Sequence, residues 1–175
     1  MTARLFVALW PPDDVVARAE KALAAVRHTD NELRWQSPDR WHITVGFLGD
    51  RDVGKEVDRF ALVPLTPAEP VRLQGAGHFG PVLWLGVATS HWLSDQAAAV
   101  MATMRAERRR FRGHMTVARS RTRTGDRQVR AAVSALEGFQ SPSWTPSELT
   151  LVLSTIGPRP AYEVIARSPL TAVGP

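Results

Sequence analysis

One four-residue pattern occurs twice in this chain and restricts its fold more than any other feature. The pattern is His-x-Thr-Val, at residues 42–45 and 114–117, and each copy lies in an apolar stretch that predicts a β-strand. Side chains alternate between the faces of a strand, so each histidine shares a face with the threonine two residues later, and the residue between them points into a core. With the threonine and valine content of this chain, chance gives two such matches in fewer than about one sequence in a thousand.

The segments around the two motifs repeat one order of elements: a strand, a helix and the motif strand. In the first half these are expected at residues 5–9, 12–26 and 41–48. In the second half they are expected at residues 82–87, 90–109 and 111–118. The other expected elements are helices at 55–60 and 126–136 and strands at 71–74, 149–154 and 162–166. A repeated order with diverged sequence indicates a duplicated lobe, one copy from each half.

The fold class that this pattern predicts is α+β. We expect two pseudo-symmetric lobes, each an antiparallel sheet with helices packed on its outer side, and an active-site cleft between them. No linker or low-complexity tract separates the halves, so residues 1–175 are expected to form a single compact bilobal domain, with one histidine motif from each lobe. A hydrophobic content of 44% with 22% charged residues is ordinary for a globular protein, and a monomer is the default expectation.

Composition excludes several kinds of chemistry and location. The chain has no cysteine, which removes disulfides, thiolate nucleophiles and cysteine-based zinc sites and is typical of a cytoplasmic protein. The apolar run at the N-terminus is followed at once by Pro-Pro-Asp-Asp at residues 11–14, so it is too short for a signal peptide or a membrane span. We therefore expect a cytoplasmic protein that does not contact a membrane.

Positive charge is concentrated around the second motif. Between residues 105 and 130 ten arginines stand against two acidic residues, a balance of +8, while the whole chain carries +5 and the remainder therefore −3. Such a cluster favours contact with a polyanion such as RNA; arginines at helix ends, or a biased base composition, are the alternative explanation. Arg112, Arg121 and Arg123 are candidates to hold RNA phosphates, with solvated surface as the alternative for each.

Two imidazoles and two hydroxyls that face each other supply most of what phosphodiester cleavage needs without a metal. In-line attack requires a base on the water and an acid on the departing oxygen, and an imidazole with a pKa near 6.5 serves in either role. Thr44 and Thr116 would donate hydrogen bonds to the phosphate oxygens as charge develops. Because the motifs are nearly symmetric, the sequence alone does not assign the acid and the base.

Neither a cofactor nor a metal is expected. A zinc hydrolase is the first competing class, but no HExxH motif, cysteine or carboxylate at fixed spacing accompanies the two histidines. The second competing class is a non-catalytic RNA-binding module that uses the arginine segment alone. That module would need neither the paired histidines nor the paired threonines.

The chain resembles a known family over nearly its whole length. The resemblance rests on the two motifs with their flanking strands and on four further runs, at residues 4–9, 41–49, 82–87 and 111–119, with a late segment at 162–170. Together they are similar to the bacterial RNA 2′,3′-cyclic phosphodiesterases, also called 2′-5′ RNA ligases, of the two-histidine phosphoesterase superfamily. One difference is Gly113, because relatives often have proline before the second histidine.

The resemblance implies a fold, a reaction and residue roles. It implies a bilobal fold with a central cleft and an enzyme that opens RNA 2′,3′-cyclic phosphate ends to 2′-phosphomonoesters. His42 would be the proton donor to the leaving 3′ oxygen, and His114 the proton acceptor that activates water. The alternative within the superfamily is a different substrate, either a nucleotide-derived cyclic phosphate or a 2′-5′ linkage, including RNA ligation.

Several further residues are candidates with an ordinary alternative. Arg119 is a candidate phosphate ligand, although strict alternation puts it on the face opposite His114 unless a bulge or the strand end re-aims it. Trp41 and Trp84 would stack a terminal base if they faced the cleft, and a core position is the commoner outcome for such residues. The other three histidines have no partner motif. His78 is at the turn that leads into the expected strand at residues 82–87 and is the candidate to line the cleft. His28 is expected at the end of a helix and His91 near the start of one.

Overall fold

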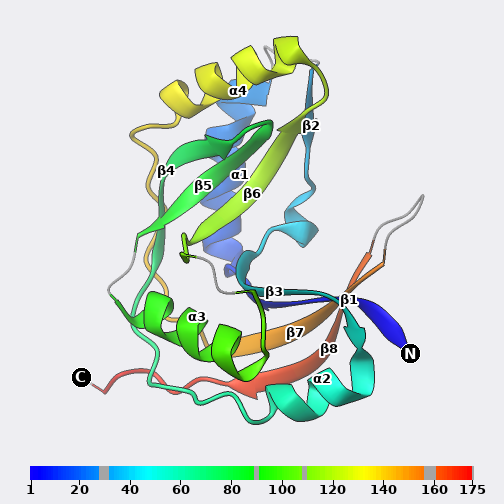
Figure 1. The fold of residues 1–175 in the computed structure, drawn as a ribbon. Helices are drawn as coiled ribbons and strands as arrows, with labels where there is room; N and C mark the ends of the chain where they lie inside the picture. The colour runs from blue at the N-terminus through cyan, green and yellow to red at the C-terminus, as the bar shows by residue number, and fades with distance from the viewer. Residues whose placement is uncertain (28–31, 89–90, 108–109, 156–160, 175) are drawn as a thin grey trace.

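A computed structural model describes residues 1–27, 32–88, 91–107, 110–155 and 161–174. Figure 1 shows two lobes, one above the other, and the described residues form an α+β fold as the sequence predicted. The elements in chain order are β1 (Thr2–Leu9), α1 (Asp13–Arg27), β2 (Leu33–Trp35), a short 3₁₀ turn (Pro38–Arg40), β3 (Ile43–Asp52), α2 (Val53–Phe60), β4 (Arg72–Phe79), β5 (Val82–Ala88), α3 (Trp92–Thr103), β6 (His114–Ser120), α4 (Arg123–Ala135), β7 (Glu148–Thr155) and β8 (Ala161–Pro169).

The strands form a sheet of two halves that are joined at one point. The strand order is β4-β5-β6-β3-β1-β7-β8, with β2 paired to β6, and every pairing between these strands is antiparallel. Between β3 and β6 the described residues make a single pair, Ile43 with Met115. We call β1, β3, β7 and β8 with α2 and α3 the first lobe, and β2, β4, β5 and β6 with α1 and α4 the second lobe.

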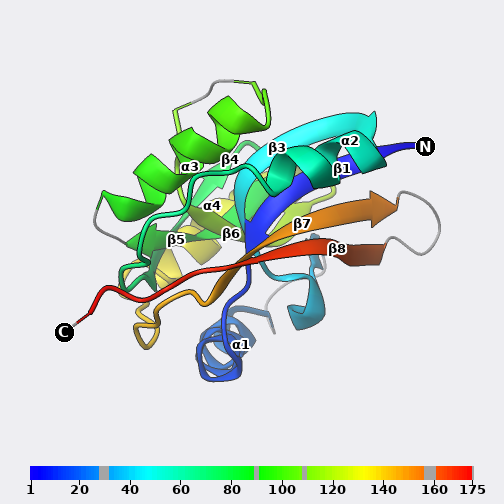
Figure 2. The same ribbon diagram turned by 90° about the horizontal axis from the view of Figure 1, so that it is seen from below.

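The lobes are not the two halves of the chain, so this part of the sequence prediction is wrong. The last strands, β7 and β8, pair onto β1 in the first lobe. Helix α1 follows β1 but reaches the second lobe, where Arg18 lies over the Phe139 ring at 5.2 Å and Arg27 over the Trp35 ring at 5.1 Å. Helix α3 follows β5 but packs on β3. Figure 2 shows α1 on the opposite side of the first-lobe strands from α2 and α3. Periodicity predicts each element but not the sheet on which it packs.

In each lobe a helix covers the face of the motif strand that carries the buried residues. On β3, a Cβ atom added at Gly46 would come within 2.9 Å of Val100 of α3. On β6, Gly125 of α4 lies so close to Ser120 that a Cβ atom there would be 2.7 Å from the Ser120 Cβ. The opposite faces of β3 and β6 are left for the motif histidines, which agrees with helices on the outer side of each sheet.

Local sequence explains where several elements begin and end. Helix α2 starts after Asp52, whose carboxylate accepts a hydrogen bond from the Lys55 amide at 3.0 Å, and α4 starts after Thr122, whose hydroxyl accepts from the Gly125 amide at 3.0 Å. The second cap places the start of α4 three residues before the predicted position. Helix α3 ends at Thr103, six residues short of the prediction, and the motif strands begin at Ile43 and His114.

One hydrophobic core runs through both lobes. It contains Leu5 and Leu149 of the first lobe and Leu85 of the second, together with Ile43 and Met115 at the junction. Trp41 belongs to the same core and is 1% exposed, so the ordinary alternative holds for this tryptophan and base stacking does not. No helix among the described residues is long and apolar enough to cross a membrane.

Candidate active site

The pair formed by Ile43 and Met115 sets the geometry of the two motifs. Both side chains are fully buried, whereas the neighbouring His42, Thr44, His114 and Thr116 are partly exposed. Antiparallel pairing continued by one residue on either side sets His42 opposite Thr116 and Thr44 opposite His114. Each imidazole therefore faces the hydroxyl of the other motif, and the predicted division of faces is observed in both strands.

The two imidazoles are held by the same hydrogen bond. The Nδ1 atom of His42 is 2.8 Å from the carbonyl oxygen of Arg40, and the Nδ1 atom of His114 is 2.7 Å from that of Arg112. A carbonyl oxygen only accepts, so Nδ1 carries the proton in both rings. In the neutral state each histidine therefore keeps Nε2 as the basic nitrogen, which is the arrangement that proton transfer requires.

Aromatic rings surround each histidine. Around His42, the Phe6 ring stacks at 4.7 Å, the Tyr162 ring lies edge-on at 5.2 Å and the Trp10 ring is tilted at 5.4 Å. Around His114, the Phe79 ring lies edge-on at 5.0 Å and the Trp84 ring is tilted at 5.9 Å. His42 therefore has the more enclosed position of the two.

This enclosure changes the protonation of His42. Burial lowers the pKa of His42 from 6.5 to about 4, and the hydrogen bond to the Arg40 carbonyl opposes this shift only in part. The positive charges of Arg40 and His114 lower the pKa further. His42 is therefore neutral near pH 7 in the free protein, and it lies within electrostatic range of His114.

A β-bulge places Arg119 on the face of the motif. On β6, Thr116 pairs with Trp84 and Ala118 with Leu83, so Val117 has no partner on β5. Val117 and Ala118 are both fully buried in succession, and Arg119 after them is exposed. Alternation resumes one residue late, which turns Arg119 to the side of His114 and Thr116. Strict alternation required a bulge or the strand end to turn Arg119 toward the face of His114, and the bulge at Val117 does this.

The first motif strand, β3, also contains a β-bulge at the equivalent position. Val45 is the extra residue between Thr44 and Gly46 in the pairing of β3 with β1. Residues 42–48 and 114–120 consequently share one burial pattern, position by position. Phe47 is the counterpart of Arg119 and is 55% exposed. The pseudo-symmetry of the motifs therefore extends to the fifth residue after each histidine, where one lobe presents a phenyl ring and the other a guanidinium.

An arginine stands two residues before each histidine. The Arg40 guanidinium lies over the Tyr162 ring at 4.7 Å, and that of Arg112 lies over the Phe79 ring at 5.9 Å. Because Tyr162 and Phe79 also contact the two imidazoles, each histidine has an arginine and an aromatic ring as neighbours. Sequence reasoning missed Arg40, although the shared spacing Arg-x-His-x-Thr was the signal that would have found it.

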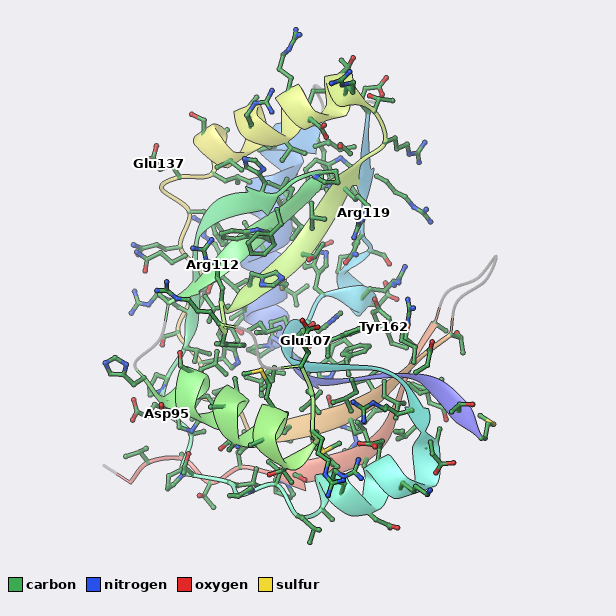
Figure 3. All side chains as sticks on the ribbon, viewed as in Figure 1. Asp95, Glu107, Arg112, Arg119, Glu137 and Tyr162 are labelled. Carbon is green, nitrogen blue, oxygen red and sulfur yellow. The ribbon has the colours of Figure 1, made fainter. Side chains whose placement is uncertain are left out.

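A small cleft opens between the lobes beside the motifs. Its volume is about 150 Å³. Thr44 and Phe47 line it from the first lobe and His114 from the second, with Glu107 and Arg112 from the segment between α3 and β6. Figure 3 shows Glu107, Arg112 and Tyr162 along the boundary between the lobes and Arg119 further along β6.

Trp84 of β5 lies on the same face as the motif residues, because it pairs with Thr116, and its ring is 5.9 Å from that of His114. Its ring lies flat over Gly77, where a Cβ atom would come within 2.2 Å of the indole. Phe79 packs against the ring at 5.1 Å. The two sequence candidates for base stacking therefore differ: Trp84 lies on the motif face beside His114, and Trp41 is in the core.

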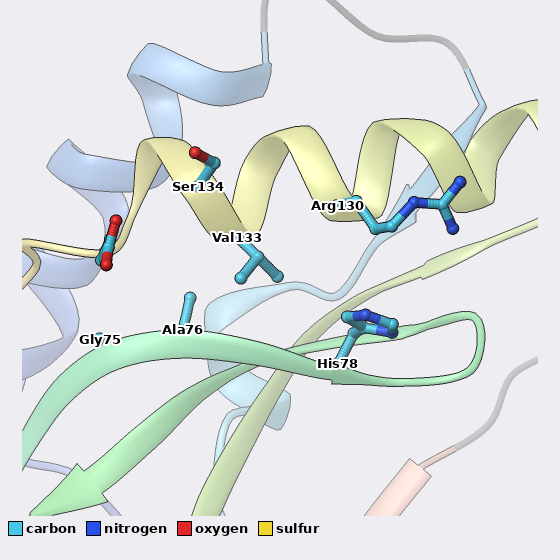
Figure 4. Close-up of a pocket in the computed structure, with 7 residues that line it drawn as sticks. Gly75, Ala76, His78, Arg130, Val133 and Ser134 are labelled. Atoms are coloured by element: carbon cyan, nitrogen blue, oxygen red, sulfur yellow. The ribbon is translucent and has the colours of Figure 1, made fainter.

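The remaining histidines lie away from the motifs. His78 is on the face of β4 opposite Trp84, and it lines a separate hollow of about 420 Å³ between β4 and α4 with Arg130 and Glu137 (Figure 4). The suggestion that His78 lines the active-site cleft is therefore wrong, because strand alternation turns it outward. His91 precedes α3, and His28 lies outside the described residues.

The described residues hold no group of three or more histidine, aspartate or glutamate side chains that could bind a metal ion. The backbone around His114 is fixed at Gly113, where the carbonyl accepts a hydrogen bond from the Val87 amide at 3.0 Å. With glycine at this position, His114 is anchored through the backbone of Gly113 and through the hydrogen bond from its own Nδ1 to the Arg112 carbonyl.

The fold and the paired motifs define the class of the protein. A family model described as the 2′-5′ RNA ligase superfamily matches residues 11–155. The chain belongs to this superfamily, which confirms the family expected from the motifs. No curated protein sequence matches the chain.

Solved structures share the fold over nearly the full length. LigT of E. coli in its apo form superposes with a TM-score of 0.80 at 23% identity, covering 97% of this chain and 98% of LigT. TT0787 of Thermus thermophilus gives a TM-score of 0.72 at 22% identity, covering 97% and 98%. The ns2 PDE domain of MHV gives 0.59 at 14% identity, covering 89% and 99%. At these identities the likeness shows the fold.

Proposed function

We propose that the protein hydrolyses 2′,3′-cyclic phosphate ends of RNA to 2′-phosphomonoesters, without a metal or cofactor. The observation that carries this proposal is the crossed arrangement of the motifs about Ile43 and Met115. It gives two imidazoles with the same Nδ1–H tautomer, each opposite a hydroxyl from the other motif. These are the groups that an in-line displacement at phosphorus uses on its two sides.

The reaction needs one proton to leave water and one to reach the ribose. His114 Nε2 takes a proton from water as the water oxygen bonds to phosphorus. The bond from phosphorus to the 3′ oxygen breaks, and His42 gives that oxygen its proton. Thr44 and Thr116 donate hydrogen bonds to the non-bridging oxygens, where negative charge increases. The product is a 2′-phosphomonoester beside a free 3′ hydroxyl.

The low pKa of His42 adds one requirement to this assignment. His42 is neutral in the free protein, so as the acid it must take up a proton when the substrate binds. The negative phosphate group between the imidazoles favours the charged form and raises the pKa of His42. Proton uptake on binding is therefore part of the proposal, and it distinguishes the proposed roles from the reverse assignment.

Arg119 is assigned to the phosphate and Trp84 to the terminal base. The bulge on β6 brings Arg119 to the cleft side, where a guanidinium pairs well with phosphate oxygens. Trp84 presents an indole ring fixed over Gly77, which suits stacking on an unpaired base. The structures of LigT of E. coli with 3′-AMP and with phosphate support ligands of this chemistry.

The test replaces each motif histidine by glutamine. His42→Gln and His114→Gln are each expected to lower kcat on an oligoribonucleotide cyclic phosphate by at least about a hundredfold. His91→Gln is the matched control, because that residue precedes α3 and is not part of either motif. Activity in the parent protein should persist in EDTA. Full activity in either motif variant, or its loss in EDTA with recovery on added metal, would contradict the proposal.

Ligation is the second candidate, because the matched family is described by this activity. In that reaction a 5′-hydroxyl of RNA replaces water, its oxygen bonds to phosphorus, and the 3′ oxygen leaves with a proton. The join formed is a 2′-5′ linkage. The same two histidines serve both reactions, so adding an RNA with a 5′-hydroxyl to the assay and counting joined against hydrolysed ends separates them.

Both lobes contribute to the one site, so we propose that residues 1–175 act as a single unit. Each motif strand brings one imidazole, and a separated lobe would lack the opposing hydroxyl. Nothing in this arrangement needs a second chain, and we propose a cytoplasmic monomer. Sedimentation of the protein with and without a cyclic-phosphate RNA checks the oligomeric state.

A further inference from the structure

Two arginines face each other across neighbouring strands beside the cleft. Arg34 of β2 is directly opposite Arg119 of β6 in the antiparallel register. Opposed residues of such a pair point to the same face, and both side chains are exposed. Arg34 therefore lies on the side to which the bulge turns Arg119. Sequence reasoning did not single out Arg34, because the three-residue strand β2 carries no motif and its pairing with β6 is not visible in the sequence.

No salt bridge within 4.0 Å pairs the guanidinium of Arg34 or of Arg119 with a carboxylate in the described part of the chain. Like charges directly opposite on a sheet destabilise it. A bound anion reverses the sign of that interaction, because each guanidinium then pairs with a phosphate group. Two opposed guanidiniums without ion-pair partners are expected on a surface that binds a polyanion.

The first lobe lacks this feature at the corresponding place. There Phe47 replaces Arg119, and the nearby Arg4 has Asp50 at 3.9 Å. Arg4 therefore has an acidic partner, while Arg34 and Arg119 form no ion pair among the described residues. An RNA strand that leaves the cleft is consequently favoured to run over β6 and β2.

The exposed positive charge without an ion-pair partner extends over only a short part of β6. Arg121 is the next exposed residue after β6 on this side, and its amide donates to the carbonyl of Glu32 at 3.1 Å. The Glu32 carboxylate accepts a hydrogen bond from the Thr122 hydroxyl at 2.7 Å. An acidic group thus stands beside the strand at this point. The free positive charge spans about one residue pair, which fits one phosphate beyond the reacting one.

We propose that Arg34 holds the internucleotide phosphate on the 5′ side of the terminal nucleotide, next to Arg119 on the reacting phosphate. The inference rests on the proposed function and names its substrate class. The protein prefers oligoribonucleotides with a cyclic phosphate end to cyclic mononucleotides, because only an oligonucleotide carries the second phosphate.

The experiment compares two substrates that differ by that phosphate. These are adenosine 2′,3′-cyclic phosphate and the dinucleotide ApA with a 2′,3′-cyclic phosphate end. Arg34→Ala is expected to lower kcat/KM for the dinucleotide about tenfold and to leave the mononucleotide unchanged. Arg127→Ala is the matched control, because Arg127 is exposed on α4, and α4 covers the opposite face of β6. Removing one phosphate contact should also weaken the dependence of dinucleotide affinity on salt concentration.

The outcomes separate this inference from the proposed function. Equal loss on both substrates, or no loss on either, overturns the role of Arg34 while hydrolysis itself stands. If the parent protein opens neither substrate, the proposed function fails. If Arg34→Ala is poorly folded, Arg34→Lys and Arg34→Gln replace it: a role in phosphate contact requires the lysine variant to retain more of the dinucleotide preference than the glutamine variant.

Discussion

Ile43 and Met115 form the residue pair that joins the two motif strands, and both side chains are fully buried. This contact makes one site of two motifs from opposite lobes, because it sets the register in which each histidine faces the other motif's threonine. We therefore expect stability and activity to depend on the same pair.

Truncation of the junction should destabilise the protein and reduce its activity together. Met115→Ala removes a fully buried side chain and is expected to lower the free energy of unfolding by about 2–4 kcal/mol. Urea denaturation followed by fluorescence measures this change, with Leu62→Ala as control because Leu62 is 73% exposed. A loss below about 1 kcal/mol would show that the lobes are held together elsewhere.

His42 should titrate far below the ordinary range of a histidine side chain. Its pKa is lowered to about 4, so its imidazole resonances should shift with a midpoint near pH 4 in an NMR titration. Inorganic phosphate bound in the cleft should raise that midpoint, since the anion favours the charged ring. A midpoint near 6.5 without phosphate would contradict the enclosed position described for His42.

The same pKa shift makes stability depend on pH. Between about pH 6.5 and 4 the unfolded chain binds a proton at residue 42 and the folded protein does not, so stability falls as pH decreases through this window. The loss amounts to about 3 kcal/mol and is complete below about pH 4. His42→Gln should remove this part of the pH dependence. Unfolding curves of both proteins from about pH 7 to 4 make the comparison.

The charge of Arg40 should act on the neighbouring imidazole. Arg40→Gln removes a positive charge that lowers the pKa of His42, so the midpoint of the His42 titration should rise. The backbone carbonyl that accepts from Nδ1 is unchanged by the substitution. Arg18→Gln on α1 is the control and should leave the midpoint where it was. A fall in the midpoint after Arg40→Gln would contradict the electrostatic effect assigned to this side chain.

A methyl group under Trp84 should disturb the base-stacking position alone. Gly77→Ala places a Cβ atom where the indole ring now lies, 2.2 Å away, so the ring must move. We expect a change in tryptophan fluorescence and a rise in KM of several-fold with a smaller change in kcat. Gly138→Ala is the matched control, because nothing lies within 4 Å of its added Cβ. An unchanged KM would remove Trp84 from substrate binding.

The family, the fold class and the face of each motif residue were predictable from the sequence, because strand alternation over a few residues is a strong local rule. The sequence also indicated that Arg119 reaches the face of His114 only if a bulge or the strand end turns it, and the structure has a bulge at Val117. A bulge depends on the pairing of two strands, so its presence was beyond single-sequence reasoning. The same limit explains the error over lobe composition: helices α1 and α3 pack on partners that periodicity does not identify.

Several site residues required the structure for a similar reason. Phe6 and Tyr162 are far from the motifs in sequence and reach His42 only through ring contacts. Arg34 is close to the first motif in sequence, but only the pairing of β2 with β6 sets it opposite Arg119. The low pKa of His42 also depends on this enclosure. Sequence symmetry suggested two equivalent histidines, and the folded environments make them different.

The central claim is tested most directly by identifying the product formed from an oligoribonucleotide with a 2′,3′-cyclic phosphate end, in EDTA and ¹⁸O-labelled water. We predict a 2′-phosphomonoester with one ¹⁸O atom on phosphorus, formed at least about a hundredfold more slowly by the His42→Gln and His114→Gln variants. A 3′-phosphomonoester would contradict the bond assigned to cleavage. An unaltered cyclic end with the parent protein would contradict the proposed activity as a whole.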